Sequence, residues 1–186
     1  MVTTPSSTVS KAESTENVAE IVSNVPYDKK EVSTVSAPTV SESENSTSSA
    51  PTAPFFVLPV GGIVTKEYDE KTPQYSETYK DWRLHLGIDI TAETGTAVYS
   101  SASGEVTKIY DDAMWGKVVE ISHGGGIVGI YCGLNKNVPV NEGDQIEPGQ
   151  QIGSIYSVPC EAVEPAHIHF AMKLDGKWVN PTDYMN

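Results

Sequence analysis

The chain has 186 residues, a formal net charge of -13 at pH 7 and two cysteines. This length fits one ordinary domain with an appendage. The acidic charge argues against a nucleic-acid partner, because affinity for phosphate backbones comes from Lys and Arg side chains, and it disfavours electrostatic binding to anionic lipid. Apolar runs in the sequence stay well below the roughly 18 residues of a membrane-spanning helix.

Residues 1–54 are dominated by Ser, Thr, Val, Glu, Pro and Ala, with Tyr27 as the single aromatic residue. Such a segment cannot bury enough apolar surface to offset the ordering of its backbone, about 1 to 2 kcal/mol per residue. We predict a flexible, disordered linker over these residues. The start, MVTTPSSTVS, lacks the features of a secretory signal. We therefore interpret the chain as an interior segment joined to a start methionine, with any membrane anchor outside it.

Residues 55–186 contain all three Trp, all three Phe and all four His of the chain, and we predict one domain there. From Thr96 onward, short runs rich in Val, Ile and Tyr alternate with Gly, Asn, Asp and Pro. This pattern is typical of an all-β domain, in which the glycine-containing segments form turns. The predicted strands lie in the segments 97–110, 117–123, 126–131, 150–156 and 167–172.

Three of the four histidines fall in two tight clusters. The segment LHLGIDI places His85 and Asp89 four residues apart, with Gly87 between them adding no bulk, and AHIHF places His167 and His169 two apart. Alternate residues of a strand point to the same face, so both imidazoles of the second cluster share a face. Two neutral histidines and one carboxylate are a ligand set that zinc accepts with a fourth position open. Together the clusters predict a metal site.

Simpler explanations exist for single residues of these types. A lone histidine near an apolar run is more often hydrogen-bonded in the core than bound to a metal, and we assign His123 such a role in a turn or core. Cys132 and Cys160 fit neither a metal clip nor a redox motif. We expect two buried or free thiols rather than a disulfide, because two cysteines are too few for a disulfide framework.

The chain resembles the LytM/lysostaphin-type zinc metallopeptidases, which cut peptide cross-bridges of bacterial peptidoglycan. The resemblance covers roughly residues 54–186 and rests on five ordered segments: LHLGIDI, GTAVYSSASGEVTKI, VVEISHGGGIVGIYCGL, VNEGDQIEPGQQIGSI and HIHF. It implies a LytM-type antiparallel β-sheet of barrel-like form. It also implies zinc bound by His85, Asp89 and His169, with His167 as a catalytic histidine that is not a ligand.

The chain departs from this family where a second catalytic histidine is expected. The family pattern Tyr-x-His-Leu corresponds to YCGL, so Gly133 takes the place of the histidine. Loss of one group that stabilises the oxyanion or transfers protons lowers a rate by about 10² to 10³. Strand alternation predicts that Cys132 points to the opposite face and packs in the interior, so it does not replace the missing group. We infer a degenerate metallopeptidase that holds zinc without hydrolysing peptidoglycan.

A second departure is the segment YSVPCEAVEPA before HIHF, which replaces the small, Gly/Ser/Thr-rich loop of active relatives. Its Val, Pro and two Glu residues change the lining of the substrate groove. We therefore do not expect a preserved peptide site.

Degenerate members of this family act in envelope assembly of endospore-forming bacteria, and the chain resembles a clostridial one. That resemblance implies a soluble fragment of a forespore membrane-anchored, extracytoplasmic protein. It also implies a partner, a stage III sporulation protein AH-like membrane protein of the mother cell, bound across the intermembrane space during engulfment. Residues 1–54 are then either a tether with a root-mean-square span of roughly 40 Å or a dispensable terminus.

Two other hypotheses stay open. One is an active zinc endopeptidase that cleaves peptidoglycan cross-bridges with a displaced base, in keeping with the retained His167 and all three ligands. The other is a β-domain that binds no metal.

Overall fold

The computed structural model describes residues 55–185. The predicted linker over residues 1–54 lies outside this range. The twelve strands are β1 (Ile63–Lys66), β2 (Asp69–Ser76), β3 (Asp81–His85), β4 (Ile88–Thr91), β5 (Ala97–Tyr99), β6 (Gly104–Asp112), β7 (Gly116–Gly124), β8 (Ile127–Leu134), β9 (Gln145–Ile146), β10 (Gln151–Ser154), β11 (His167–Leu174) and β12 (Lys177–Val179). Two short 3-10 helices, η1 (Pro159–Glu161) and η2 (Pro181–Tyr184), complete the described elements.

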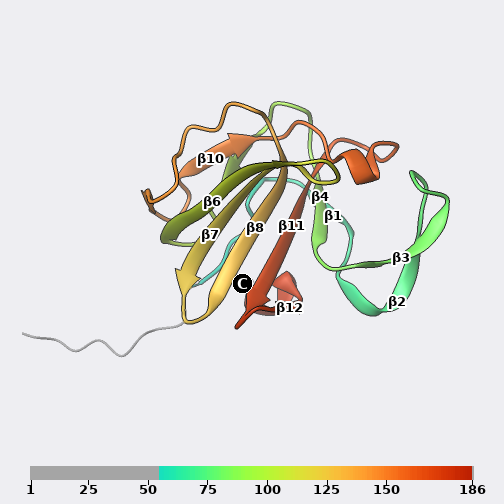
Figure 1. The fold of residues 1–186 in the computed structure, drawn as a ribbon, viewed down its shortest axis with the longest axis horizontal. Helices are drawn as coiled ribbons and strands as arrows, with labels where there is room; N and C mark the ends of the chain where they lie inside the picture. The colour runs from blue at the N-terminus through green and yellow to red at the C-terminus, as the bar shows by residue number, and fades with distance from the viewer. Residues whose placement is uncertain (1–54, 186) are drawn as a thin grey trace, which may run out of the picture. The chain divides into compact units, whose positions relative to one another are not determined.

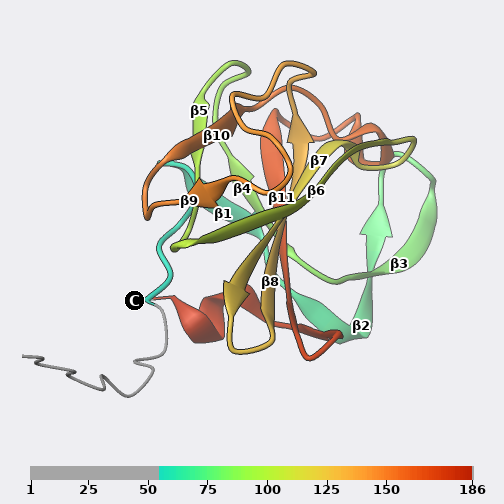
Figure 2. The ribbon, with the colours of Figure 1, turned by 60° about the vertical axis from the view of Figure 1, so that its left-hand side comes forward.

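The main sheet has the strand order β1-β4-β11-β8-β7-β6-β9, and β12 pairs with β11. Two smaller sheets are the pair β10-β5 and the hairpin β2-β3. In Figures 1 and 2 the β2-β3 hairpin stands away from the main sheet. Every strand pairing between these elements is antiparallel, which confirms the predicted all-β, antiparallel fold class.

Strand β11 separates the core from the face that carries the histidines. Ile168 and Phe170 are fully buried in the larger hydrophobic cluster, where the Phe170 ring lies 4.8 Å from that of Tyr131. The alternate residues His167 and His169 point to the other face, as the period of two in a strand requires. One strand therefore anchors the core and presents two imidazoles at once.

The predicted strands from residue 97 onward are confirmed by β5, β6, β7, β8, β10 and β11, although a bend at Ser101–Ser103 divides the first run in two. Strand β2 was not predicted, because its residues DEKTPQYS are mostly polar and exposed and carry no apolar alternation. Within residues 55–185, no helix has the length and apolar character needed to cross a membrane.

Candidate metal centre

Three predicted ligands come together where β4 and β11 meet the end of β3. His85 Nε2 lies 3.1 Å from Asp89 Oδ1 and 3.2 Å from His169 Nδ1, and Asp89 Oδ1 lies 2.8 Å from His169 Nδ1. These separations approach the edge of about 3.3 Å in a tetrahedron with zinc bond lengths of about 2.0 to 2.1 Å. All three side chains are buried.

The local sequence explains why these side chains meet. Asp89 is paired with His169 across the β4-β11 ladder, and paired residues of neighbouring strands share a face of the sheet. Gly87 lies between His85 and Asp89, and a Cβ atom there would lie 2.5 Å from His169 Nε2. The missing side chain at Gly87 therefore lets the His169 ring approach, as the sequence suggested.

The hydrogen bonds around His85 leave its inner nitrogen ready for a cation. His85 Nδ1–H donates to the carbonyl oxygen of Glu67 at 2.8 Å, so in the neutral ring Nε2 carries a lone pair. That lone pair faces Asp89 Oδ1 at 3.1 Å, and two acceptors at this distance repel unless a proton or a metal ion lies between them. Asp89 Oδ2 is also buried and has no hydrogen-bond partner among the described residues. The residues present fit a zinc ion.

The pKa values of His85 and Asp89 are both shifted in the direction that favours the ionised form. Burial alone lowers the pKa of His85, but the hydrogen bond and charge of Asp89 outweigh it and raise the pKa above its ordinary value. Burial likewise opposes ionisation of Asp89, but hydrogen bonds from His169 and His85 bring its pKa well below the usual range. The carboxylate is therefore ionised at neutral pH and available to a metal.

His167 lies beside these donor atoms rather than among them. Its Nδ1–H donates to the carbonyl oxygen of Pro165 at 2.7 Å, and its Nε2 lies 3.4 Å from Glu161 Oε2. Burial lowers the pKa of His167, but the Glu161 carboxylate more than compensates and raises the pKa to about 9. His123, by contrast, donates to the carbonyl oxygen of Ser103 at 2.8 Å, which confirms its role as a turn or core histidine.

At the position of the second catalytic histidine, Gly133 has a φ of 84°, in the left-handed region that favours glycine. Leu134 pairs with Lys117 and Cys132 with Val118, so Gly133 is the extra residue of a bulge. A Cβ atom at Gly133 would lie 2.5 Å from Val158 Cγ2. The space next to this position is therefore filled by another side chain.

The predicted orientation of Cys132 was wrong. Cys132 is buried, but it pairs with His169 and packs with Val118, Ile130 and Ala171 on the histidine face, away from the main core. The bulge explains the error, because simple alternation along β8 does not continue through Gly133. Cys132 and Cys160 are both buried free thiols, as expected.

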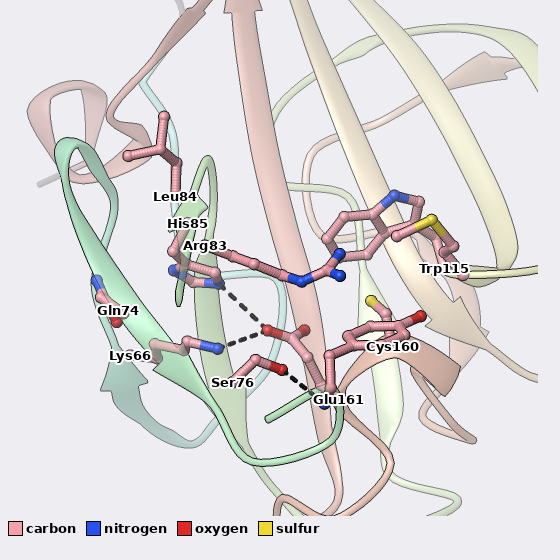
Figure 3. Close-up of a pocket in the computed structure, with 11 residues that line it drawn as sticks. Lys66, Gln74, Ser76, Arg83, Leu84, His85, Trp115, Cys160 and Glu161 are labelled. Carbon is pink, nitrogen blue, oxygen red and sulfur yellow. Dashed lines mark hydrogen bonds and ion pairs between the residues drawn. The ribbon is translucent and has the colours of Figure 1, made fainter. Parts of the chain in front are cut away.

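Sequence reasoning noted Glu161 only as part of a changed groove lining and missed Lys66, whereas the structure places both at the centre. Glu161, on η1, is buried, and Lys66, on β1, has its Nζ 2.7 Å from Glu161 Oε1 and 3.2 Å from Glu164 Oε1. Figure 3 shows Glu161 pointing toward His85 and Lys66 in a pocket that Trp115 also lines. The segment that contains Glu161 is unusual in composition, but its fold could not be deduced from that composition. Nothing in the local sequence indicated that Lys66 would reach the centre, since it lies 95 residues from Glu161.

Comparison with known proteins identifies the family. Residues 83–181 match Peptidase family M23, which is more than half of the chain. The chain belongs to this peptidase family. Stage II sporulation protein Q of Bacillus subtilis (strain 168) is 33% identical over 114 residues, covering 60% of this chain and 39% of that protein. The resemblance to sporulation members of the family is thus confirmed.

Two further similarities are informative. The DD-carboxypeptidase/endopeptidase Mpg of Neisseria meningitidis serogroup B is 35% identical over 100 residues, covering 54% of this chain and 22% of that protein. A chain in the structure of the SpoIIQ-SpoIIIAH pore forming complex superposes with a TM-score of 0.63 and 26% identity, covering 73% of this chain and 93% of that one. The chain spans well under half the length of both stage II sporulation protein Q and Mpg.

Proposed function

We propose that this chain is a zinc-binding, non-catalytic, extracytoplasmic domain that docks a stage III sporulation protein AH-like membrane protein across the forespore intermembrane space. The observation that carries the docking role is the likeness to a chain of the SpoIIQ-SpoIIIAH pore forming complex, which extends over 93% of that chain. A second structure of a SpoIIIAH and SpoIIQ complex gives a TM-score of 0.61 at 27% identity. A chain with this fold therefore occurs in both of these SpoIIQ and SpoIIIAH complexes.

The proposal that zinc is bound by His85, Asp89 and His169 rests on the three converging donor atoms and on Asp89 Oδ2, which has no hydrogen-bond partner among the described residues. When bound at such a centre, zinc polarises a water molecule or a carbonyl group. Whether the polarised group would react depends on the other side chains at the site. Hydrolysis also needs groups that hold and transfer protons at the reacting atoms.

Gly133 supports the absence of catalysis, because glycine has no side chain that could act as a donor, acceptor or base. Val158 fills the adjacent space and leaves no room for a side chain at this position. His167 is retained, but its Nε2 is turned to the carboxylate of Glu161, which holds its proton. Neither of the two histidine positions is therefore free to serve a substrate.

The membrane anchor and the forespore location are part of the same proposal. They rest on the likeness to stage II sporulation protein Q, of which the chain covers only 39%. Residues 1–54 would then be a tether between an anchor outside this sequence and the docking domain. Peptidoglycan is an additional candidate ligand of the domain.

The docking role is tested by a pull-down with the purified ectodomain of the stage III sporulation protein AH-like partner, with and without a zinc chelator. We expect capture of the partner, reduced in chelator if zinc orders the docking face. No capture with zinc present contradicts the docking role.

The alternative is an active zinc endopeptidase, as the similarity to the endopeptidase Mpg suggests. Incubation with purified peptidoglycan and zinc separates the two functions. We expect no release of cross-bridge fragments above a His169→Ala control. Release above that control establishes the enzyme instead.

A further inference from the structure

The buried carboxylate of Glu161 faces the same space as the three predicted ligands. Glu161 Oε2 lies 3.6 Å from His169 Nδ1, and Glu161 Oε1 lies 3.8 Å from His85 Nε2. Donor atoms of His85, Asp89, Glu161 and His169 all lie within 4.8 Å of one another, and all four residues are buried. The fourth side chain thus stands where an active zinc enzyme keeps its open position.

The backbone around Glu161 fixes this placement. Both Tyr156 N–H and Ser157 N–H donate to the carbonyl oxygen of Gly133, at 2.8 and 3.1 Å, and Cys160 N–H donates to that of Met114 at 2.8 Å. The turn of η1 then directs the next side chain, Glu161, inward. The segment that carries Glu161 is therefore attached to β8 before Val158 and to the turn between β6 and β7 after it.

The charges around the centre are those that a divalent cation would balance. Lys66 Nζ is close to the carboxylates of Glu161, Glu164 and Asp89, at 2.7, 3.2 and 3.8 Å. The three carboxylates outnumber the positive charges of Lys66 and His167, so the cluster carries an excess of negative charge. Burying that excess uncompensated is unfavourable, and a zinc ion held among these groups offsets it.

We propose that Glu161 is a fourth protein ligand, which closes the zinc site and makes it a structural one. The inference rests on the proposed function only in that the chain binds zinc. Four protein ligands leave no position for a water molecule or a substrate carbonyl. Two residues of the segment 156–165 then prevent catalysis: Val158 fills the space next to Gly133, and Glu161 takes the open position at the metal.

The first test uses the unaltered chain loaded with Co²⁺, whose visible absorption reports the number and kind of ligands. Acetohydroxamate binds a metal that has an open position. We expect the spectrum of the unaltered chain to stay the same on titration with acetohydroxamate, and that of Glu161→Ala to change. A spectral change in the unaltered chain overturns the inference, and no variant needs to fold for that result.

The second test measures Zn²⁺ affinity by competition with a chromophoric chelator. Glu161→Gln should weaken binding by more than about 100-fold, because loss of an outer-shell partner alone typically weakens it 10- to 100-fold. Glu164→Gln is the matched control, because it removes the same charge from the same segment and also contacts Lys66. Equal losses in the two variants, or no loss in Glu161→Gln, overturn a direct ligand role.

The outcomes separate this inference from the proposed function. An unaltered chain that binds no Zn²⁺ overturns both the zinc part of the proposed function and the role of Glu161. A chain that binds Zn²⁺ and captures its partner but admits acetohydroxamate overturns the role of Glu161 alone.

Discussion

Restoring a side chain at position 133 should destabilise the protein rather than reactivate it. A residue other than glycine at a φ of 84° is strained by roughly 1 to 2 kcal/mol. Its Cβ would also meet Val158 Cγ2 at 2.5 Å, and overpacking of this kind costs about 1 to 3 kcal/mol. Gly133→Ala should therefore lower the free energy of unfolding by about 2 to 5 kcal/mol, and Gly133→His by at least as much.

The two contributions can be separated with a matched glycine. Gly95 has a φ of 89°, and a Cβ atom added there would meet nothing within 4 Å, so Gly95→Ala should lose only about 1 to 2 kcal/mol. Urea unfolding of the three single variants, all in chelator, measures these losses. A double-mutant cycle with Val158→Ala should return the overpacking part as a coupling energy.

Two results would refute this reasoning. Gly133→Ala and Gly95→Ala could prove equally destabilising, which would mean that Val158 does not obstruct position 133. Alternatively, Gly133→His could keep the unaltered stability and cleave peptidoglycan, which would mean that a single side chain separates this domain from an enzyme. Because domain stabilities are commonly about 5 to 15 kcal/mol, the expected loss is well within reach of the measurement.

Three further predictions concern the metal, pH and the core. Zinc at a hundredfold excess over its Kd should raise the free energy of unfolding by about 2.7 kcal/mol and Tm by about 10 °C, and His85→Ala should abolish this effect. An unchanged melting curve in chelator contradicts a bound ion. In the metal-free protein, the raised pKa of His167 contributes stability below its unfolded value of 6.5 that is lost as pH rises through about 9. Urea unfolding in chelator should thus show falling stability over that window and a flatter profile in Glu161→Gln, while a rise would have the wrong sign. Tyr131→Phe should lower the free energy of unfolding by about 1 to 3 kcal/mol, because the buried Ser101 N–H, which donates to Tyr131 Oη at 3.0 Å, loses its acceptor. Thermal unfolding within error of the unaltered chain would count against this.

The convergence of the three proposed metal ligands was predictable from sequence because it depends on local periodicity. His167 and His169 share a face through the period of two in a strand, and this holds wherever the strand is regular. The pairing of His169 with Asp89 depends on β4 lying next to β11, which the resemblance to a known family supplied. Local spacing and family likeness were therefore sufficient for this part of the site.

Other features could not be predicted because they depend on irregular backbone. The bulge at Gly133 reverses the expected orientation around Cys132, and a bulge has no distinctive sequence pattern beyond the glycine itself. Glu161 reaches the centre only because η1 turns its segment inward, and Lys66 reaches it from a distant strand. Tertiary contacts between distant segments determine both placements.

The alternation along β11 also ties the proposed metal binding to folding. A register slip of one residue would bring His169 into the apolar core and move Phe170 out to the histidine face. The slipped pairing therefore cannot form while His169 holds an ion on that face. An ion held by His169 therefore opposes the slipped pairing as well as local opening. The amide protons of β11 and of its neighbours β4 and β8 should accordingly exchange more slowly when zinc is bound, with the protection extending along the strands well beyond the ligands themselves.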